Sequence, residues 1–228
     1  MALILQLETS TSSCSVALAL DGQVLALKEL NERNAHAGML TLLIEEAMTE
    51  SGKAFSELNA VAVSMGPGSY TGLRIGVSTA KGLCYALDVP LIAVNTLEAM
   101  TFGMKSAYED DSVFYCPMID ARRMEVYSAV YNPNMEEVLP VDARIIDENS
   151  FSELLKKKKV LFFGDGAMKC KDALSYDNAL FISDFINSAA HLTALAYQKF
   201  KENNFVDVAY FEPFYLKDFL VTQPKAVR

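Results

Sequence analysis

Two glycine- or hydroxyl-rich stretches carry the residue types that bind phosphate. The longer one, Ser64 to Gly76, follows an apolar run at 60–63 and precedes a helical pattern at 73–87. Glycine permits a tight turn, and Ser69 and Thr71 can cap the first N–H groups of the helix. A helix N-terminus after such a turn is a natural anion site. The alternative is a close-packing turn without a ligand, and no Gly-Lys-Ser/Thr follows that would indicate a Walker A loop.

The shorter stretch, Glu8 to Ser13, follows the first apolar run of the chain. The two stretches together give the candidate nucleotide or phosphate loop: Ser10, Thr11, Ser12, Gly68, Ser69 and Thr71. Glu8 and Asp120 follow the first predicted strands of the two halves, where ATP hydrolysis would need a carboxylate to hold magnesium. We favour a relic or structural role for both, because Asp120 can pair with Arg122 or Arg123.

Other catalytic groups are not indicated. The chain has two histidines, His36 and His191, in different halves, and no His-x-x-x-His pair, because position 40 is leucine and position 32 is glutamate. A metallopeptidase or a metal-dependent transferase would need such a pair or its equivalent. A serine nucleophile at Ser69 would need a positioned histidine base, which no pattern suggests. We therefore predict no catalytic residue and no metal site.

Composition limits the class of protein. The 228 residues suffice for one large or two small domains, and 51% are apolar, with a mean hydropathy of +0.16. No apolar run approaches the roughly 18 residues of a membrane span, and the N-terminus lacks a signal-peptide pattern. Four scattered cysteines fit a reducing cytoplasm. The net charge of −9 argues against an independent nucleic-acid binder, and the basic run at 156–159 is interpreted as a solvated helix end.

The elements predict a duplicated α/β plan. Three strands with an Asp21-Gly22 hairpin open the chain, then helix, strand, helix and strand follow, and residues from 113 onward repeat the theme. In this second half we predict a helix after the glycine turn at 164–166 and another at 188–201. We place the boundary in the acidic break at 109–112, which gives an N-terminal subdomain at 1–105 and a C-terminal one at 106–228. The last residues of the second are expected to pack back on the first.

Two predicted helices carry more apolar surface than a sheet needs. In the helix at 36–50 the apolar residues cover close to half of the circumference, which suggests contact with another subunit or a position between two core elements. The helix at 73–87 carries its apolar residues at spacings of three and four. We expect the two helices to form a paired surface for a partner. The candidate interface residues are His36, Met39, Leu40, Leu43, Ala47, Leu73, Val77 and Ala80.

Several motifs resemble the TsaB (YeaZ) family of the actin–hexokinase–Hsp70 (ASKHA) superfamily. They are Leu7-Glu8-Thr9-Ser10 with Ser15-Val16-Ala17, His36, the stretch 66–76 with Ala80-Lys81-Gly82-Leu83, Asp120-Ala121-Arg122 with Glu125-Val126-Tyr127, and Pro213-Phe214-Tyr215-Leu216-Lys217. Two departures are mild: family members commonly have Phe at Tyr70 and Arg at Lys217.

The resemblance implies an actin-like, ribonuclease H-like fold of two similar subdomains, each a mixed sheet flanked by helices. It further implies a cytoplasmic role in making N6-threonylcarbamoyladenosine beside the anticodon of tRNAs that read ANN codons. In that system TsaD transfers the threonylcarbamoyl group, TsaB is its non-catalytic partner, and the ATPase TsaE joins them. TsaB also forms homodimers, and the tRNA is expected to contact mainly the partners.

Two hypotheses of different class remain open. The first is a non-enzymatic subunit that allows TsaD to work, without a cofactor of its own. The second is an independent nucleotide-binding enzyme of the superfamily, an ATPase or kinase that uses the candidate phosphate loop. A weaker variant of the first keeps ATP or ADP only at the junction with TsaD.

Overall fold

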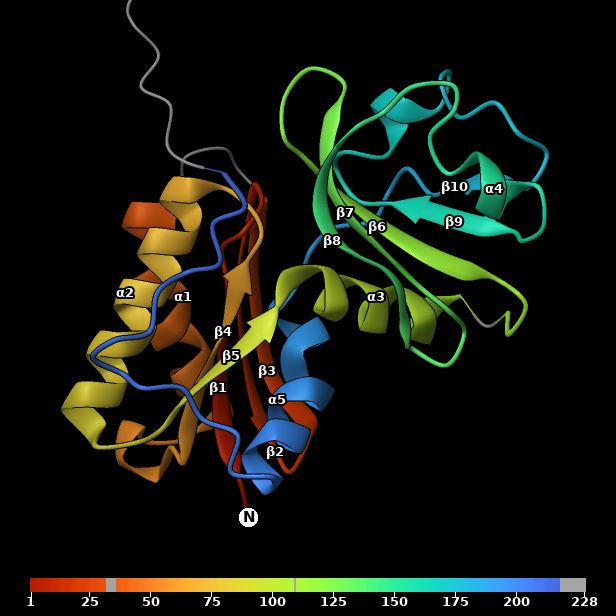
Figure 1. The fold of residues 1–228 in the computed structure, drawn as a ribbon. Helices are drawn as coiled ribbons and strands as arrows, with labels where there is room; N and C mark the ends of the chain where they lie inside the picture. Colours follow the sequence, from red (N-terminus) through yellow and green to blue (C-terminus); the bar gives the residue numbers. More distant parts are fainter. Residues whose placement is uncertain (32–35, 109, 218–228) are drawn as a thin grey trace, which may run out of the picture.

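The computed structural model describes residues 1–31, 36–108 and 110–217, and only the backbone of residues 36 and 37. Within them the chain forms two five-stranded mixed sheets with helices on their faces. Figure 1 shows the sheet of the first half beside α1 and α2, and the sheet of the second half on the far side of α3. The predicted α/β architecture is therefore confirmed.

The first sheet has the strand order β3-β2-β1-β4-β5. Its strands are β1 (Leu3–Glu8), β2 (Ser13–Leu20), β3 (Gln23–Asn31), β4 (Ala60–Gly66) and β5 (Leu91–Asn95). The predicted antiparallel meander is present, and Asp21 and Gly22 of its hairpin both have positive φ. β1, β4 and β5 pair in parallel, so their carboxyl ends meet at one edge of the sheet.

Two long helices cover one face of this sheet and shorter helices cover the other. The helices are α1 (His36–Ser51), α2 (Tyr70–Leu87), α3 (Thr96–Ala107) and α5 (Thr193–Lys201), with single 3-10 turns η1 (Phe55–Glu57) and η3 (Ala189–Leu192). Alternation along β1 decides the two faces. Leu3, Leu5 and Leu7 pack with α1 and α2, whereas Ile4 packs with α5. Each fully buried leucine contributes about 1.5–3 kcal/mol relative to an exposed one.

The second sheet has the order β10-β9-β6-β7-β8. Its strands are β6 (Phe114–Asp120), β7 (Glu125–Tyr131), β8 (Glu137–Ile145), β9 (Val160–Phe163) and β10 (Ala179–Phe181). Its helical elements are short: α4 (Ser152–Leu155) and η2 (Met168–Cys170). η2 stands where the sequence suggested a helix after Gly164–Gly166. β1 and β6 therefore hold equivalent central places in the two halves, each paired with an antiparallel and a parallel neighbour.

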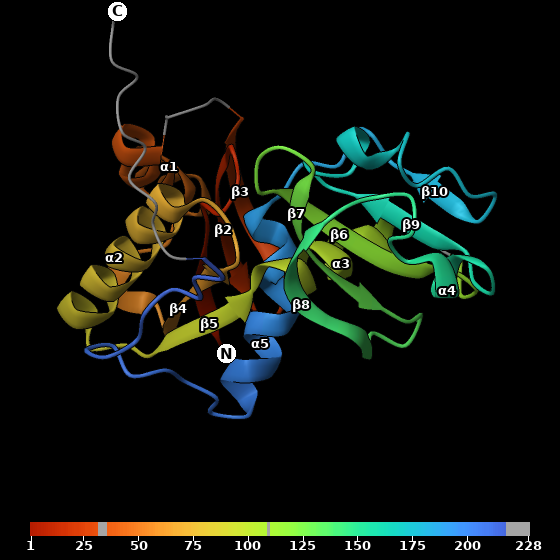
Figure 2. The ribbon, with the colours of Figure 1, turned by 45° about the horizontal axis from the view of Figure 1, so that its top comes forward.

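The two halves are joined through α3 and through the end of the chain. α3 packs Leu97 and Met100 against the apolar face of the second sheet, while Ala99 packs on the first. Figures 1 and 2 both show α3 between the two sheets and α5 against the first. After α5, the C-terminal segment (residues 205–217) runs along β5 and α2, beginning with a bridge between Val206 and Leu91. No helix among the described residues is long and apolar enough to cross a membrane.

Candidate functional site: the carboxyl edges of the two sheets

The hydroxyl-rich turn after β1 is organised by the buried carboxylate of Glu8. The Oε1 of Glu8 accepts hydrogen bonds from the backbone N–H of Ser10 at 2.6 Å and from its hydroxyl at 2.5 Å. Glu8 is fully buried and its Oε2 has no partner among the described residues. Burial raises the pKa of Glu8, and the hydrogen bonds from Ser10 oppose that shift. Glu8 therefore holds the turn from inside and does not face solvent.

The glycine-rich stretch packs directly on this turn. A Cβ at Gly68 would lie 2.4 Å from the carbonyl oxygen of Ser10, and one at Gly72 would lie 2.0 Å from that of Thr9. The Ser69 N–H donates to the carbonyl of Ser10 at 2.7 Å, and the Thr9 hydroxyl donates to the carbonyl of Gly72. These glycines are thus required by the approach of two backbones.

The start of α2 is capped from within. The Ser69 hydroxyl accepts the N–H of Gly72 at 3.3 Å, as a helix N-cap does. Since the Ser69 N–H is also taken by Ser10, two of the donors that an anion would use already have protein acceptors. The geometry supports the close-packing interpretation of this stretch over the anion-binding one.

A pocket of about 350 Å³ lies between the two halves, beside the turn after β1. Its lining comes from the turn at 11–13, the end of β3, α3, the turn after β9 and the segment 183–187. Of the candidate phosphate loop, Thr11 and Ser12 line this pocket, while Ser10 is buried beneath the turn. Gly68, Ser69 and Thr71 are not among the lining residues. The structure therefore does not gather the candidate phosphate loop around one cavity.

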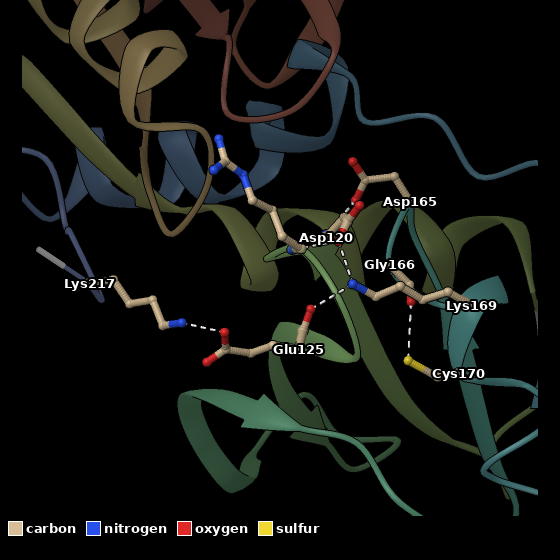
Figure 3. A network of polar contacts seen from close by, with 8 residues as sticks. Asp120, Glu125, Asp165, Gly166, Lys169, Cys170 and Lys217 are labelled. Carbon is tan, nitrogen blue, oxygen red and sulfur yellow. Dashed lines mark hydrogen bonds and ion pairs between the residues drawn. The ribbon is translucent and has the colours of Figure 1, made fainter. Parts of the chain in front are cut away.

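The end of β6 carries a network of ion pairs, shown in Figure 3. Asp120 pairs with the ammonium group of Lys169, which also donates to the carbonyl of Glu125 at 2.7 Å. This contact takes the place of the predicted side-chain pairing of Asp120 with Arg122 or Arg123. Arg122 instead donates its backbone N–H to Asp120, at 2.8 Å. Lys217 of the C-terminal segment pairs with the Glu125 carboxylate. The network thus ties the end of the chain to the second sheet.

The C-terminal segment also fixes the loop that leads into α2. The ammonium group of Lys81 on α2 donates to the carbonyls of Ala209 and Phe211, at 3.0 and 3.1 Å. The Phe214 N–H donates to the carbonyl of Met65 at 2.7 Å, and the ring of Tyr215 contacts that of Tyr70. Nothing in the local sequence around Lys81 or Lys169 signalled these roles, because each partner lies far along the chain.

Most of the candidate interface residues lie in the core. Leu40, Leu43, Ala47, Leu73, Val77 and Ala80 are all buried in the core beneath α1 and α2. Met39 is partly exposed, and the side chain of His36 lies outside the described residues. The apolar spacing identified the faces of the helices that pack inward on the sheet, so these six residues position the helices, and their contact with a partner stays a prediction. The wider apolar coverage of α1 comes from Leu42, which is 47% exposed.

The other candidate groups are accounted for by packing. His191 stacks on Phe185 with ring centroids 5.2 Å apart, lies against Gly103, and has its pKa lowered by burial. Among the described residues no group of three or more His, Cys, Asp or Glu side chains is arranged to hold a metal ion. All four cysteines are free and buried, and burial raises the pKa of Cys14 and Cys84 to about 11, so they are thiols at neutral pH.

Comparisons with known proteins agree with this arrangement. The family model for TsaD, tRNA N6-adenosine threonylcarbamoyltransferase, matches residues 23–221. The tRNA threonylcarbamoyladenosine biosynthesis protein TsaB of Escherichia coli (strain K12) is 33% identical over 94% of both chains. A Pseudomonas aeruginosa protein with similarity to peptidase YEAZ superposes with a TM-score of 0.84, at 25% identity, over 95% of this chain and 100% of that one.

A more distant neighbour shows the superfamily fold. The activator of 2-hydroxyisocaproyl-CoA dehydratase from Clostridium difficile, a structure with bound ADPNP, superposes with a TM-score of 0.53 at 11% identity, over 89% of this chain and 97% of that one. At this identity the likeness concerns the fold alone. Together with the match over nearly the whole chain to TsaB, these findings show that the chain belongs to the TsaB (YeaZ) family and has the fold of the ASKHA superfamily.

Proposed function

We propose that this chain is the non-catalytic partner subunit of a TsaD-type transferase. In this role it is required to form N6-threonylcarbamoyladenosine next to the anticodon of tRNAs that read ANN codons. The family supports the pathway, since relatives bear the name of tRNA threonylcarbamoyladenosine biosynthesis proteins. A match to a transferase of Anaplasma phagocytophilum, 37% identical over 42% of this chain, supports a shared ancestry with the proposed partner.

The observation that carries the partner role is the outer face of α1 and α2. Leu42 on α1 is 47% exposed and Tyr85 on α2 is 86% exposed. A Cβ at Gly38 or Gly82 would meet nothing within 4 Å, so packing among the residues that the structure describes explains neither glycine. Small residues let a foreign helix approach closely, and an exposed tyrosine is a typical anchor of protein interfaces. This face therefore fits a helical partner surface.

Two variants test the proposal. Leu42→Glu and Tyr85→Glu place a charge on the outer face, and we expect both to abolish co-purification with a TsaD-type partner. Neither side chain belongs to the core, so the variants should unfold at nearly the wild-type urea concentration. Val138→Glu, at an exposed valine of β8, is the matched control. Full binding by both variants would contradict the assignment of this face. Leu43→Glu is unsuitable because Leu43 is buried.

The remaining partners form part of the same proposal. A homodimer through the α1–α2 face would compete with the TsaD-type partner, so Leu42→Glu should also shift a dimer to monomer in light scattering. We place the complex in the cytoplasm, joined by a TsaE-type ATPase, with the tRNA bound mainly by the partners. Any ATP or ADP is assigned to the junction between subunits and not to this chain alone.

The alternative of an independent ATPase or kinase has weaker support. The pocket between the halves contains Thr11 and Ser12, but its lining includes no lysine, arginine or histidine. A triphosphate would face Asp165 and Asp184 there, and like charges repel without a bound cation. Calorimetry of the isolated chain with ATP and magnesium separates the two hypotheses: micromolar binding would favour the enzyme, and no heat would favour the subunit.

A further inference from the structure

The pocket between the two halves has a chemistry that the partner role does not use. Three kinds of group line it: hydroxyls of Thr11, Ser12, Ser13 and Ser183; amides of Asn31 and Asn187; and carboxylates of Asp165 and Asp184. The apolar lining residues are Met100, Phe185 and Ile186. At about 350 Å³ the pocket lies at the small end of the range for ligand sites, roughly 300–1,000 Å³.

The hydrogen bonds below the pocket run inward. The amide nitrogen of Asn187 donates to the Ser10 hydroxyl at 3.1 Å, and that hydroxyl donates to Glu8 at 2.5 Å. Asn187 is only 4% exposed, and its amide oxygen has no partner among the described residues. The hydrogen-bond donors of Asn187 and Ser10 are thus directed inward to Glu8. The amide oxygen of Asn187, a buried residue that lines the pocket, is left without a donor. An unsatisfied buried acceptor is costly and calls for a donor from a ligand or water.

The charged residues that line the pocket also favour a ligand that donates hydrogen bonds. Asp184 is exposed and makes no hydrogen bond or ion pair with the described residues. Asp165 accepts the backbone N–H of Asp120 at 2.9 Å, and Lys169, which pairs with Asp120, is near enough to act on the Asp165 carboxylate electrostatically. Two carboxylates and an amide oxygen, without a cation in the lining, disfavour an anion and favour a charged donor.

We propose that this pocket binds a cationic hydrogen-bond donor on an aliphatic stem. The ammonium or guanidinium head would contact Asp184 and Asp165, and the Asn187 oxygen only after a side-chain shift that uncovers it, while the stem would lie along Met100, Phe185 and Ile186. Such a group comes either from a lysine or arginine side chain of a bound protein or from a free polyamine. The proposal goes beyond the partner role, and its residues are separate from the α1–α2 face.

The test uses the full chain with small probes: N-acetyl-argininamide, N-acetyl-lysinamide and spermidine, each titrated to millimolar concentration and followed by amide NMR shifts. We expect saturable shifts at residues 183–187 that weaken as salt is added. Asp184→Asn should weaken binding about tenfold, since it removes a charged acceptor. Asp172→Asn, the same charge change at an exposed aspartate that does not line the pocket, should leave affinity unchanged.

The outcomes are decisive in both directions. Tighter binding of an amino-acid amide identifies a protein side chain as the source, and tighter binding of spermidine identifies a polyamine. The absence of saturable shifts with all three probes, or equal weakening by both aspartate variants, would overturn the proposal. Because Asp184→Asn leaves the α1–α2 face intact, co-purification with the TsaD-type partner should persist, so failure here is distinguishable from failure of the partner role.

Discussion

Lys81 should hold the C-terminal segment on α2, and its removal should release that segment without unfolding the sheets. In Lys81→Met the two hydrogen bonds to the carbonyls of Ala209 and Phe211 are lost. A hydrogen bond from a charged donor contributes about 1.5–3 kcal/mol when it is protected from water. Since the Ala209 contact is exposed, we discount the sum to about 2 kcal/mol, which corresponds to a roughly 30-fold larger opening constant.

Amide hydrogen exchange measures this opening directly. The reporters are the N–H groups of Phe211, bonded to Asp207, and of Phe214, bonded to Met65. Both should exchange about 30-fold faster in Lys81→Met, while the amides of β1 keep their protection. Lys157→Met, which removes an exposed lysine of the basic run, is the control.

Two results would refute the reasoning. Unchanged exchange at Phe211 and Phe214 would mean that the bridge at Val206 and the Tyr70–Tyr215 contact hold the segment by themselves. Equally faster exchange in β1 would mean that Lys81 stabilises the whole subdomain.

Three further predictions concern the turn after β1 and the helix that packs on it. Gly72→Ala should destabilise the protein by several kcal/mol in urea unfolding because its Cβ would collide with the backbone of Thr9. Gly82→Ala, where the added Cβ meets open space, should gain up to about 1 kcal/mol of stability. Equal effects of the two substitutions would disprove the close contact between Gly72 and Thr9. Ser69→Ala should cost about 1 kcal/mol through loss of the α2 cap, and Ser69→Gly only a few tenths. For Glu8 the folded-state pKa is raised, so the native state binds more protons than the unfolded state and stability falls as pH rises above the ordinary glutamate range. The stability of Glu8→Gln relative to the wild type should therefore rise as the pH increases above the ordinary glutamate range, and parallel pH profiles of the two proteins would contradict this expectation.

Local patterns were sufficient for most of the elements. The glycine and hydroxyl residues at 66–72, followed by apolar residues at helical spacing, placed a strand, a turn and a helix where β4 and α2 stand. Asp21-Gly22 fixed the hairpin. Helices in the second half were harder to predict from the sequence. The predicted helix after Gly166 is a single 3-10 turn, and the one predicted at 188–201 divides into η3 and α5. Short helices depend on tertiary packing more than on propensity, so the sequence alone overestimates them.

The sequence by itself determined the fold family, the two amphipathic helices and the hydroxyl-rich turn, because these depend on spacing between near neighbours. Only the tertiary structure decided which face of each helix is buried, because periodicity marks an apolar stripe without saying what covers it. It also decided three contacts: the packing of Gly72 against Thr9, the ion pair of Lys169 with Asp120, and the hydrogen bond from Asn187 to Ser10. Each of these contacts joins residues that are distant in the chain, and their chemistry exists only once the sheets have brought them together.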